Sequence, residues 1–484
     1  MSQIRDLQPR LVWEIFDDIT RVPRPSKREE RIREFLVAFA EEHGIEYRCD
    51  EIGNVVMRKG ATPGYESRQT VILQSHMDMV CEKNADVEFD FERDAIRTCI
   101  EDGWVRAEGT TLGADDGIGV AAALAILVDD TVEHGPIEAL FTVDEETGLT
   151  GAFNLGADMI TGKYLVNLDS EDEGEVFIGC AGGVDTLATL RYTAEAAPAE
   201  YAYYRLDVAG LCGGHSGDDI DKGRANSNKL AARFMQMAEE QFGARLAMFD
   251  GGNLRNAIPR EAYIIFGVAA EHGAAVEALA ATYAEAVKAE FAATEPNMRL
   301  SLSAASVPQY VMDCESQGRL LKALVGVPNG VLAMSAVMPG LVETSTNLAS
   351  VKFHGEEQIV ITTSQRSSVE SAKEYAKRHV EAVFALAGCE VLHSDGYPGW
   401  APNPQSDLLE WTLQSYRELF GVEPKVRAIH AGLECGLFLE RYPQLEMVSF
   451  GPTLRGVHSP DERLEIATVD KFWLLLTSLL RRVK

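Results

Sequence analysis

The stretch Val71-Ile72-Leu73-Gln74-Ser75-His76-Met77-Asp78 links a strand to residues that can carry chemistry. Its three apolar residues predict a buried strand, which runs directly into a histidine and an aspartate. An Ala-rich helix is predicted next, over 118–127, followed by strands over 137–143 and 164–168. Strands that alternate with helices indicate a largely parallel sheet covered on both faces. The sequence therefore predicts an α/β fold.

A region of different texture interrupts this pattern. Residues 192–204 are rich in Ala, Glu and Tyr, and residues 394–400 contain Gly and Pro, as expected at crossings between domains. Amphipathic helices are predicted between the two crossings, the last over 369–387. Ser367 and Glu370 have the spacing of a capping box for that helix.

The α/β pattern resumes after the second crossing, with a predicted helix at 405–420 and a strand at 447–450. A chain of 484 residues exceeds what one compact core usually holds. We therefore predict one mostly parallel sheet domain, split in two by an inserted α+β domain. The predicted parts are 1–190, 191–393 and 394–484.

Composition excludes several classes of partner. The chain has 45 Lys and Arg residues against 75 Asp and Glu residues, a net charge of -30. Such a charge repels nucleic acid and anionic membranes, so neither is expected to bind. The eight cysteines are scattered without a C-x-x-C pair, which favours a reducing compartment. Met1 to Arg10 is polar, and the apolar run 120–128 is too short to cross a bilayer. We expect a soluble, cytoplasmic protein.

Residues that can bind metal follow four of the predicted strands. Ligands of open α/β sheets bind beyond the carboxyl ends of the strands, so these residues are expected to meet at one edge. A further aspartate pair, in Gly113-Ala114-Asp115-Asp116-Gly117, precedes the Ala-rich helix. The strand-end residues are His76 and Asp78, then Asp144, Glu145 and Glu146, then Asp169, and finally His458.

Imidazole and carboxylate are suitable zinc ligands. Two zinc ions about 3.5–4 Å apart can share one carboxylate and one hydroxide. Such a site needs about five ligands and a further carboxylate that takes a proton from water. The adjacent residues Glu145 and Glu146 supply one ligand and one base.

Each of these residues also has an ordinary structural interpretation. Asp115 or Asp116 could be only the N-cap of a helix. The run 144–146 could be a solvated stretch of charge, and His458 could be an exposed loop residue. The joint pattern, with four strand ends delivering such residues, favours a metal site over scattered surface charge.

Three features of the insert and of the second part are less specific. His215 lies in a glycine-rich loop and could donate to an oxyanion, or could simply be exposed. Arg366 ends a strand and could bind a carboxylate with two hydrogen bonds, or could be a surface charge. The segment from His430 to Gly436 is a compact turn whose role the residues alone do not assign.

The metal-binding pattern resembles the signature of the dizinc peptidases that include carboxypeptidase G and acylases. Longer segments resemble the aminoacyl-histidine dipeptidases (peptidase D) among them, and the similarity covers essentially the whole chain. These segments are 109–115, 180–183, 254–261, 430–436 and 458–462.

The resemblance assigns roles to individual residues. It makes the sheet domain catalytic and the insert a lid. Asp115 would bridge two zinc ions, Glu145 would be the general base, and His215 would stabilise the oxyanion. No ligand position departs from the pattern, and Asp116 stands where some members carry Asn. The remaining assignments are His76, Glu146, Asp169 and His458 as further ligands, Asp78 as the partner that orients His76, and Asn256 and Arg366 as substrate contacts.

The resemblance implies hydrolysis of dipeptides, Xaa-His (carnosine-like) ones preferentially, by a hydroxide bound to two Zn²⁺ ions. Co²⁺ or Mn²⁺ could substitute for zinc. An N-acyl amino-acid deacylase of the same superfamily is the alternative enzyme, because both cleave an amide next to a free carboxylate. A non-catalytic zinc-binding protein is a third interpretation, against which the presence of Glu145 argues. A homodimer is possible, and whether His215 acts in its own chain or across a dimer stays open.

Overall fold

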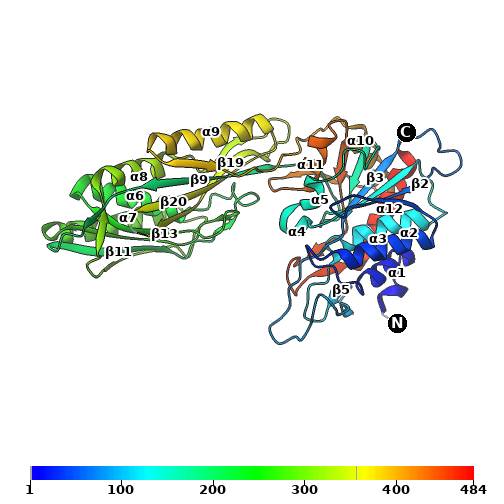
Figure 1. Cartoon of the computed structure of the whole chain (residues 1–484), viewed down its shortest axis with the longest axis horizontal. Coiled ribbons are helices and arrows are strands. Elements are labelled where there is room, and N and C mark those ends of the chain that lie inside the picture. The colour runs from blue at the N-terminus through cyan, green and yellow to red at the C-terminus, as the bar shows by residue number, and fades with distance from the viewer. Residues whose placement is uncertain (1–2, 356) are drawn as a thin grey trace. The chain divides into compact units, whose positions relative to one another are not determined.

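The structure is a computed structural model that describes residues 3–355 and 357–484. It divides into two compact units (Figure 1). Unit 1 comprises residues 1–179, 402–428 and 433–484, and unit 2 comprises residues 180–401 and 429–432. The sequence placed the crossings at 190/191 and 393/394. The predicted division into a split sheet domain and an inserted domain, with these boundaries, stays a prediction.

An eight-stranded sheet forms the centre of unit 1. Its four middle strands, β6, β3, β7 and β23, run parallel, whereas β1, β2 and β8 pair antiparallel with their neighbours. In spatial order the strands are β1 (Glu46–Cys49), β2 (Val55–Lys59), β6 (Ile137–Thr142), β3 (Val71–His76), β7 (Tyr164–Asn167), β23 (Glu446–Ser449), β8 (Glu175–Cys180) and β22 (Lys425–Ile429). The predicted α/β class is confirmed, with parallel pairing confined to the middle of the sheet.

The strands β3, β6 and β7 are short and buried throughout, as expected for parallel strands covered by helices. The Ala-rich helix α3 packs against β3 and β6, and α1 packs against α3. Because small side chains line α3, it lies close to the sheet. The helices of unit 1 are α1 (Arg10–Ile19), α2 (Glu30–Glu42), α3 (Ala114–Val128), α4 (Glu145–Gly148), α5 (Thr150–Phe153), α10 (Asp407–Phe420), α11 (Glu434–Arg441) and α12 (Ile466–Arg482), with a 3-10 turn η1 (Gln3–Asp6) before them.

A small antiparallel sheet joins distant segments of unit 1. Its order is β24 (Leu454–Arg455), β25 (Arg463–Glu465), β5 (Trp104–Ala107) and β4 (Thr98–Glu101). The loop that connects β24 and β25 carries His458, and the chain enters α3 shortly after β5. This sheet therefore brings the His458 loop and the Asp115 segment into one neighbourhood.

Unit 2 is an antiparallel sheet with helices, as the predicted α+β class requires. Its main sheet has the order β16 (Arg299–Ala304), β11 (Tyr201–Ala209), β15 (Ala262–Ala269), β13 (Arg245–Gly251), β19 (Val342–His354), β20 (Gln358–Ser367), β9 (Gly182–Arg191) and β21 (Glu390–His393), and β18 (Gly330–Met334) also pairs with β19. Two short ladders pair β10 (Ala194–Ala196) with β17 (Tyr310–Met312) and β12 (Gly214–His215) with β14 (Ala257–Ile258).

The helices of unit 2 share one apolar core with its sheet. Buried aromatic side chains from helices and strands meet there, among them Phe234, Phe249, Phe266 and Phe384. The helices are α6 (Ser227–Phe242), α7 (Gly273–Glu290), α8 (Cys314–Gly326) and α9 (Glu370–Leu386), with a 3-10 turn η2 (Ala270–His272) before α7.

Two local differences from the sequence expectations concern this unit. Helix α8 was not predicted, although Asp313 caps it by accepting a hydrogen bond from the Ser316 amide at 2.8 Å. The capping box of α9 is wrong: Val369 is the N-cap residue, and its side chain makes no cap. Ser367 instead ends β20, where its hydroxyl accepts from the Val369 amide and pairs with Thr344.

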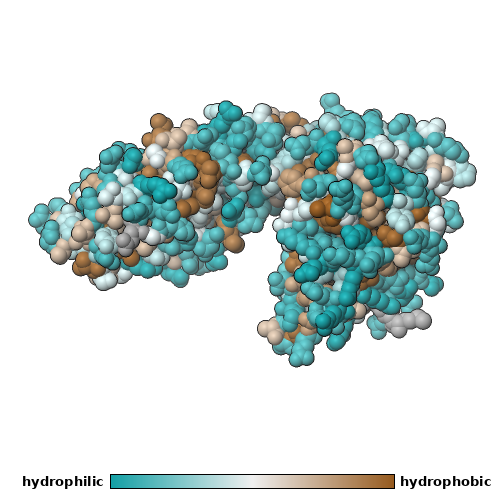
Figure 2. All heavy atoms as spheres, viewed as in Figure 1, coloured by the Kyte–Doolittle hydropathy of each residue, from teal (hydrophilic) through white to brown (hydrophobic). Residues whose placement is uncertain are grey.

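Hydrophilic residues cover most of the visible face of both units (Figure 2). This surface fits the strong excess of acidic residues. Among the described residues, no helix is both long and apolar enough to cross a membrane.

Candidate metal centre

The residues that follow the parallel strands of unit 1 meet at one edge of the sheet. His76 is the last residue of β3, Glu145 and Glu146 open α4 just after β6, and Asp169 follows β7. Asp115 lies in the first turn of α3, where its backbone is not helical. These positions follow from parallel pairing, because β6, β3 and β7 all end on the same side.

Asp115 lies between the two histidines. The Nε2 atom of His76 is 3.1 Å from its Oδ1 atom, and the Nε2 atom of His458 is 3.1 Å from its Oδ2 atom. Asp169 lies 3.5 Å from the His76 nitrogen, and Glu146 lies 3.0 Å from the His458 nitrogen. One carboxylate is therefore shared by two groups of three possible ligands, His76–Asp115–Asp169 and Asp115–Glu146–His458.

The electrostatics of this cluster indicate an excess of buried negative charge. Burial alone would lower the pKa of His76, but nearby carboxylates, Asp169 and Asp115 foremost, hold it well above its ordinary value. Burial raises the pKa of Asp169 to about 7, against the effect of His76. Hydrogen bonds to Asp115 and Glu146 raise the pKa of His458 to about 11. Cations in the cluster would relieve this excess.

Local geometry fits metal ions at this place. The Nε2 atom of each histidine faces a carboxylate oxygen, so that either an N–H group donates to the oxygen or a cation can lie between the two atoms. Oε1 of Glu146 is buried without a hydrogen-bond partner. The donor set contains nitrogen and oxygen but no sulfur, as is common for catalytic zinc sites.

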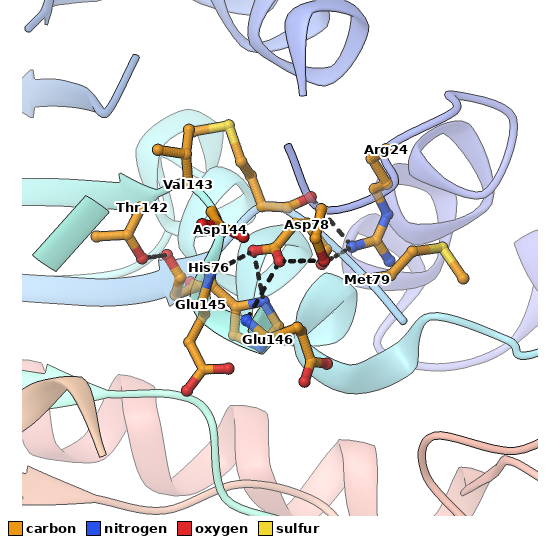
Figure 3. A network of polar contacts seen from close by, with 12 residues as sticks. Arg24, His76, Asp78, Met79, Thr142, Val143, Asp144, Glu145 and Glu146 are labelled. Carbon is orange, nitrogen blue, oxygen red and sulfur yellow. Dashed lines mark hydrogen bonds and ion pairs between the residues drawn. The ribbon is translucent and has the colours of Figure 1, made fainter. Parts of the chain in front are cut away.

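Asp78 supports the cluster from behind. Its Oδ1 atom is 3.4 Å from Nδ1 of His76, on the side of the ring opposite Nε2. The carboxylate also accepts from the backbone amides of Glu145 and Glu146, at 3.1 and 3.3 Å, and from Ser26 at 2.8 Å. Figure 3 shows these contacts around the buried Asp78 side chain. Asp78 therefore holds the loop that carries the two glutamates and lies beside the Nδ1 atom of His76.

Glu145 and Glu146 extend their carboxyl groups to the same side of this loop (Figure 3). Glu146 lies 3.0 Å from His458, whereas Glu145 lies near His76, within a third group of possible ligands that consists of His76, Glu145 and Glu146. Burial, outweighing the attraction of His76, holds the pKa of Glu145 well above its ordinary value. A carboxylate with a raised pKa is a stronger proton acceptor than an ordinary one.

A comparison with known protein families places this centre. Residues 72–482 match the peptidase family M20/M25/M40, and this range contains every residue of the cluster. The chain belongs to this peptidase family. Its members are metallopeptidases, so the M20 chain is a hydrolase.

Individual M20 relatives are similar over the whole chain. The chain is 43% identical over 483 residues to the cytosol non-specific dipeptidase of Escherichia coli K12, covering 100% of this chain and 99% of that protein. The crystal structure of aminoacylhistidine dipeptidase from Vibrio alginolyticus matches with a TM-score of 0.95 and 43% identity, covering 100% of this chain and 98% of that one. The aminopeptidase PepT from Bacillus cereus shares the fold, with a TM-score of 0.57 at 17% identity.

The other predicted site residues of the M20 chain lie in unit 2. His215 belongs to the short strand β12, and its Nδ1 atom accepts from the amides of Gly217 and Asp218 at 3.3 and 3.2 Å. Burial and the nearby Arg366 lower the pKa of His215. A neutral ring that accepts at Nδ1 carries its proton at Nε2, so His215 presents an N–H donor.

Arg366 is buried near the end of β20, where Nη1 donates to the Tyr397 hydroxyl at 2.8 Å and Nε has no partner. Asn256 is exposed in the loop before β14, and its carbonyl accepts from the Ser216 amide at 2.8 Å.

His430, which the sequence left without a role, is buried in unit 2. Its Nε2 atom is 2.8 Å from the Ser345 hydroxyl. Burial, with smaller effects of Arg366 and His215, lowers the pKa of His430 to about 4. His430, His215 and Arg366 therefore influence one another, with a guanidinium cation beside two histidines whose pKa values are lowered.

Glu434, also in the unassigned segment, lies in unit 1. It accepts from Gln74 at 2.6 Å and from Thr142 at 2.8 Å. Burial raises the pKa of Glu434 to about 8. The only sequence signal for either residue was the match of the segment 430–436 to related peptidases.

Proposed function

We propose that this M20 peptidase hydrolyses dipeptides with two metal ions held at the centre in unit 1. One observation carries the proposal: Asp115 faces an imidazole with each of its oxygens, and each imidazole has a further carboxylate beside it. His76, Asp115 and Asp169 would hold one ion, and Asp115, Glu146 and His458 the other. Zn²⁺ fits this set, and Co²⁺ or Mn²⁺ can replace it.

Bound metal ions would polarise the peptide carbonyl and make water more acidic. Glu145 then serves as general base, taking a proton from the attacking water and passing it to the nitrogen of the leaving amine. Its raised pKa and its absence from the two ligand groups that share Asp115 support this role. Asp78 keeps the imidazole of His76 in place during the reaction.

Two residues of unit 2 complete the reaction in this proposal. His215 donates from Nε2 to the oxyanion that develops on the carbonyl oxygen, which its acceptor contacts at Nδ1 support. Arg366 binds the free carboxylate of the dipeptide with its unpaired Nε–H, and Asn256 contacts the substrate beside it. Unit 2 then acts as a lid that excludes water.

The relatives support dipeptides as the substrate class. One is named as a non-specific dipeptidase and another as an aminoacylhistidine dipeptidase. We infer that Xaa-His dipeptides, carnosine-like ones included, are preferred, and that other dipeptides are also cleaved. The name of the Escherichia coli relative supports a cytoplasmic location.

The test compares Ala-His with N-acetyl-histidine, and measures release of free histidine by each. Turnover of Ala-His with little turnover of N-acetyl-histidine supports the dipeptidase. The reverse preference would assign the chain to the N-acyl amino-acid deacylases. Metal binding without turnover of either substrate would indicate a non-catalytic zinc-binding protein.

A further inference from the structure

A buried carboxylate holds the backbone of the segment that carries Asp115. Glu462 is 2% exposed, and its two oxygens accept hydrogen bonds from four consecutive backbone amides. Oε2 accepts from Leu112 and Gly113 at 2.7 and 2.9 Å, and Oε1 accepts from Ala114 and Asp115 at 2.8 and 3.3 Å. Glu462 stands four residues after His458, so one loop supplies both a ligand and this anchor.

A buried guanidinium holds the carbonyl side of the same backbone. Arg24 is 2% exposed and lies between α1 and α2. Its Nη2 atom donates to the Gly113 carbonyl, and Nη1 donates to the carbonyls of Met77 and Asp78 at 3.2 and 2.7 Å. Figure 3 shows Arg24 directed at the Asp78 backbone. Arg24 therefore ties the segment after His76 to the segment before Asp115.

Two glycines make room for this guanidinium. A Cβ atom on Gly113 or on Gly117 would lie 2.6 Å from Nη2 of Arg24, closer than real Cβ atoms approach a neighbour. Gly113 also has a φ of +70°, a conformation that favours glycine. The glycines of Gly113-Ala114-Asp115-Asp116-Gly117 thus fit the Arg24 side chain, and the motif encodes more than its two acids.

We propose that Arg24 and Glu462 are positioning residues that set the spacing of the two metal subsites. Gly113 is held at its carbonyl by Arg24 and at its amide by Glu462, two residues from the shared ligand Asp115. The pair thereby joins the three segments that carry His76, Asp115 and His458. This inference rests on the proposed function, because it assumes that these residues bind metal.

A neutral side chain would not serve in the same way. Four amides converge on Glu462, and only an ionised carboxylate offers acceptor sites to all of them. A buried charge with imperfect partners is costly, so both groups hold their loops firmly in one geometry. Their direct effect is on the backbone beside the ligands and not on the substrate.

The main test uses Glu462→Gln with a matched control. The amide keeps one acceptor oxygen but turns an N–H₂ group toward two backbone amides. Glu138→Gln is the control: Glu138 is also 2% exposed, and accepts from the amides of Thr161 and Gly162 at 2.7 and 3.0 Å. Glu138 is the second residue of β6, at the end opposite the metal ligands, so it is a buried acceptor of backbone amides in another place, where it also pairs with Arg58 at 3.1 Å.

Both variants and the wild type are loaded with Zn²⁺, and the metal affinity is measured by competition with a chromophoric chelator. We expect the affinity to fall about 10–100-fold in Glu462→Gln and to stay at the wild-type value in Glu138→Gln. Both variants are expected to lose thermal stability. The visible spectrum of the Co²⁺-loaded protein should change in Glu462→Gln alone.

Equal metal affinity in the two variants, whether lowered or intact, would overturn the positioning role while leaving the proposed function standing. A wild-type chain that binds no metal would overturn both.

Gly117→Ala keeps every charge and directs a methyl group at Arg24, so it tests the inference even when Glu462→Gln does not fold. It should also lower metal affinity, and wild-type affinity in that variant would remove Arg24 from the pair. Partial recovery in Glu462→Asp relative to Glu462→Gln would support the need for a carboxylate.

Discussion

The Nε2 atom of His458 lies 3.1 Å from Oδ2 of Asp115, although 343 residues separate the two along the chain. The opposite oxygen of Asp115 meets His76 at the same distance. Because one carboxylate faces both histidines, its removal would affect both proposed subsites together, whereas removal of any other proposed ligand would affect one.

Asp115→Ala is expected to lose both metal ions, because each proposed subsite loses a ligand and the shared bridge disappears. Elemental analysis after dialysis measures the metal content, and His458→Ala is the comparison, since it should leave the His76 subsite filled. Retention of two metal ions by Asp115→Ala would contradict the bridging role.

Chelation is expected to abolish activity, and added Zn²⁺, Mn²⁺ or Co²⁺ to restore it. At saturation, elemental analysis should find about two metal ions per chain. Full turnover of Ala-His by metal-free protein would refute the proposed function.

Glu145→Gln is expected to lower kcat by about 10²–10⁴-fold, the usual effect of a general base. Its metal content should match that of the wild type, because Glu145 is not among the proposed ligands. Steady-state kinetics and elemental analysis of the same preparation check both statements. A near-normal kcat would show that another group takes the proton.

His215→Ala is expected to lower kcat by about 10²–10³-fold with a much smaller change in KM, because an oxyanion donor acts mainly in the transition state. Metal content should be unchanged, since His215 lies in unit 2. A wild-type kcat would leave His215 as a half-buried residue of a glycine-rich loop with no catalytic role.

The same variant shows in which chain His215 acts. Inactive His215→Ala is mixed with inactive Glu145→Gln, and subunit exchange is followed separately. Recovered activity would show that the histidine acts across a dimer. No recovery despite exchange would place its action within its own chain.

Acid should destabilise the protein partly through His430. Its pKa is lowered to about 4 in the folded state, against an ordinary value of 6.5 for the unfolded chain. Between these two pKa values the imidazole is protonated in the unfolded state and neutral in the folded state. The free energy of unfolding therefore falls as the pH drops from about 6.5 to about 4. The full effect is roughly 3 kcal/mol.

His430→Asn should remove that part of the pH dependence. Urea unfolding of metal-free protein at pH 7 and pH 4.5, for wild type and variant, isolates the contribution as a difference between the two. Parallel pH profiles would show that His430 is not the titrating group.

The strands and their ends could be predicted because the signal is local. Apolar runs such as 71–73 identify buried strands, and parallel pairing then sends His76 and Asp169 to one edge. The His, Asp and Glu residues at those ends then predicted a metal site. The sequence thus led to the α/β class and to the residues that the structure brings together around Asp115.

Other parts of the centre could not be predicted from local pattern. Glu462 and Arg24 act on backbone groups about 350 and 90 residues away, and nothing in their own neighbourhoods indicates those partners. Glu434 meets Gln74 and Thr142 only in the folded sheet. Ser367 has the spacing of an N-cap residue for α9, but in the structure it is the last residue of β20 and pairs with β19.

The order of the strands in the main sheet of unit 1 has a consequence for biosynthesis. β23 lies between β7 and β8, yet it and the His458 loop are made about 270 residues or more after them. At about 5–20 residues per second, a ribosome needs roughly 14–54 s to cover that interval. A nascent chain therefore lacks the neighbour β23 beside β7, and lacks His458 beside Asp115, until residues 446–458 have been made. The proposed subsite of Asp115, Glu146 and His458 is consequently the later of the two to be completed, because the ligands of the other subsite are all made by residue 169.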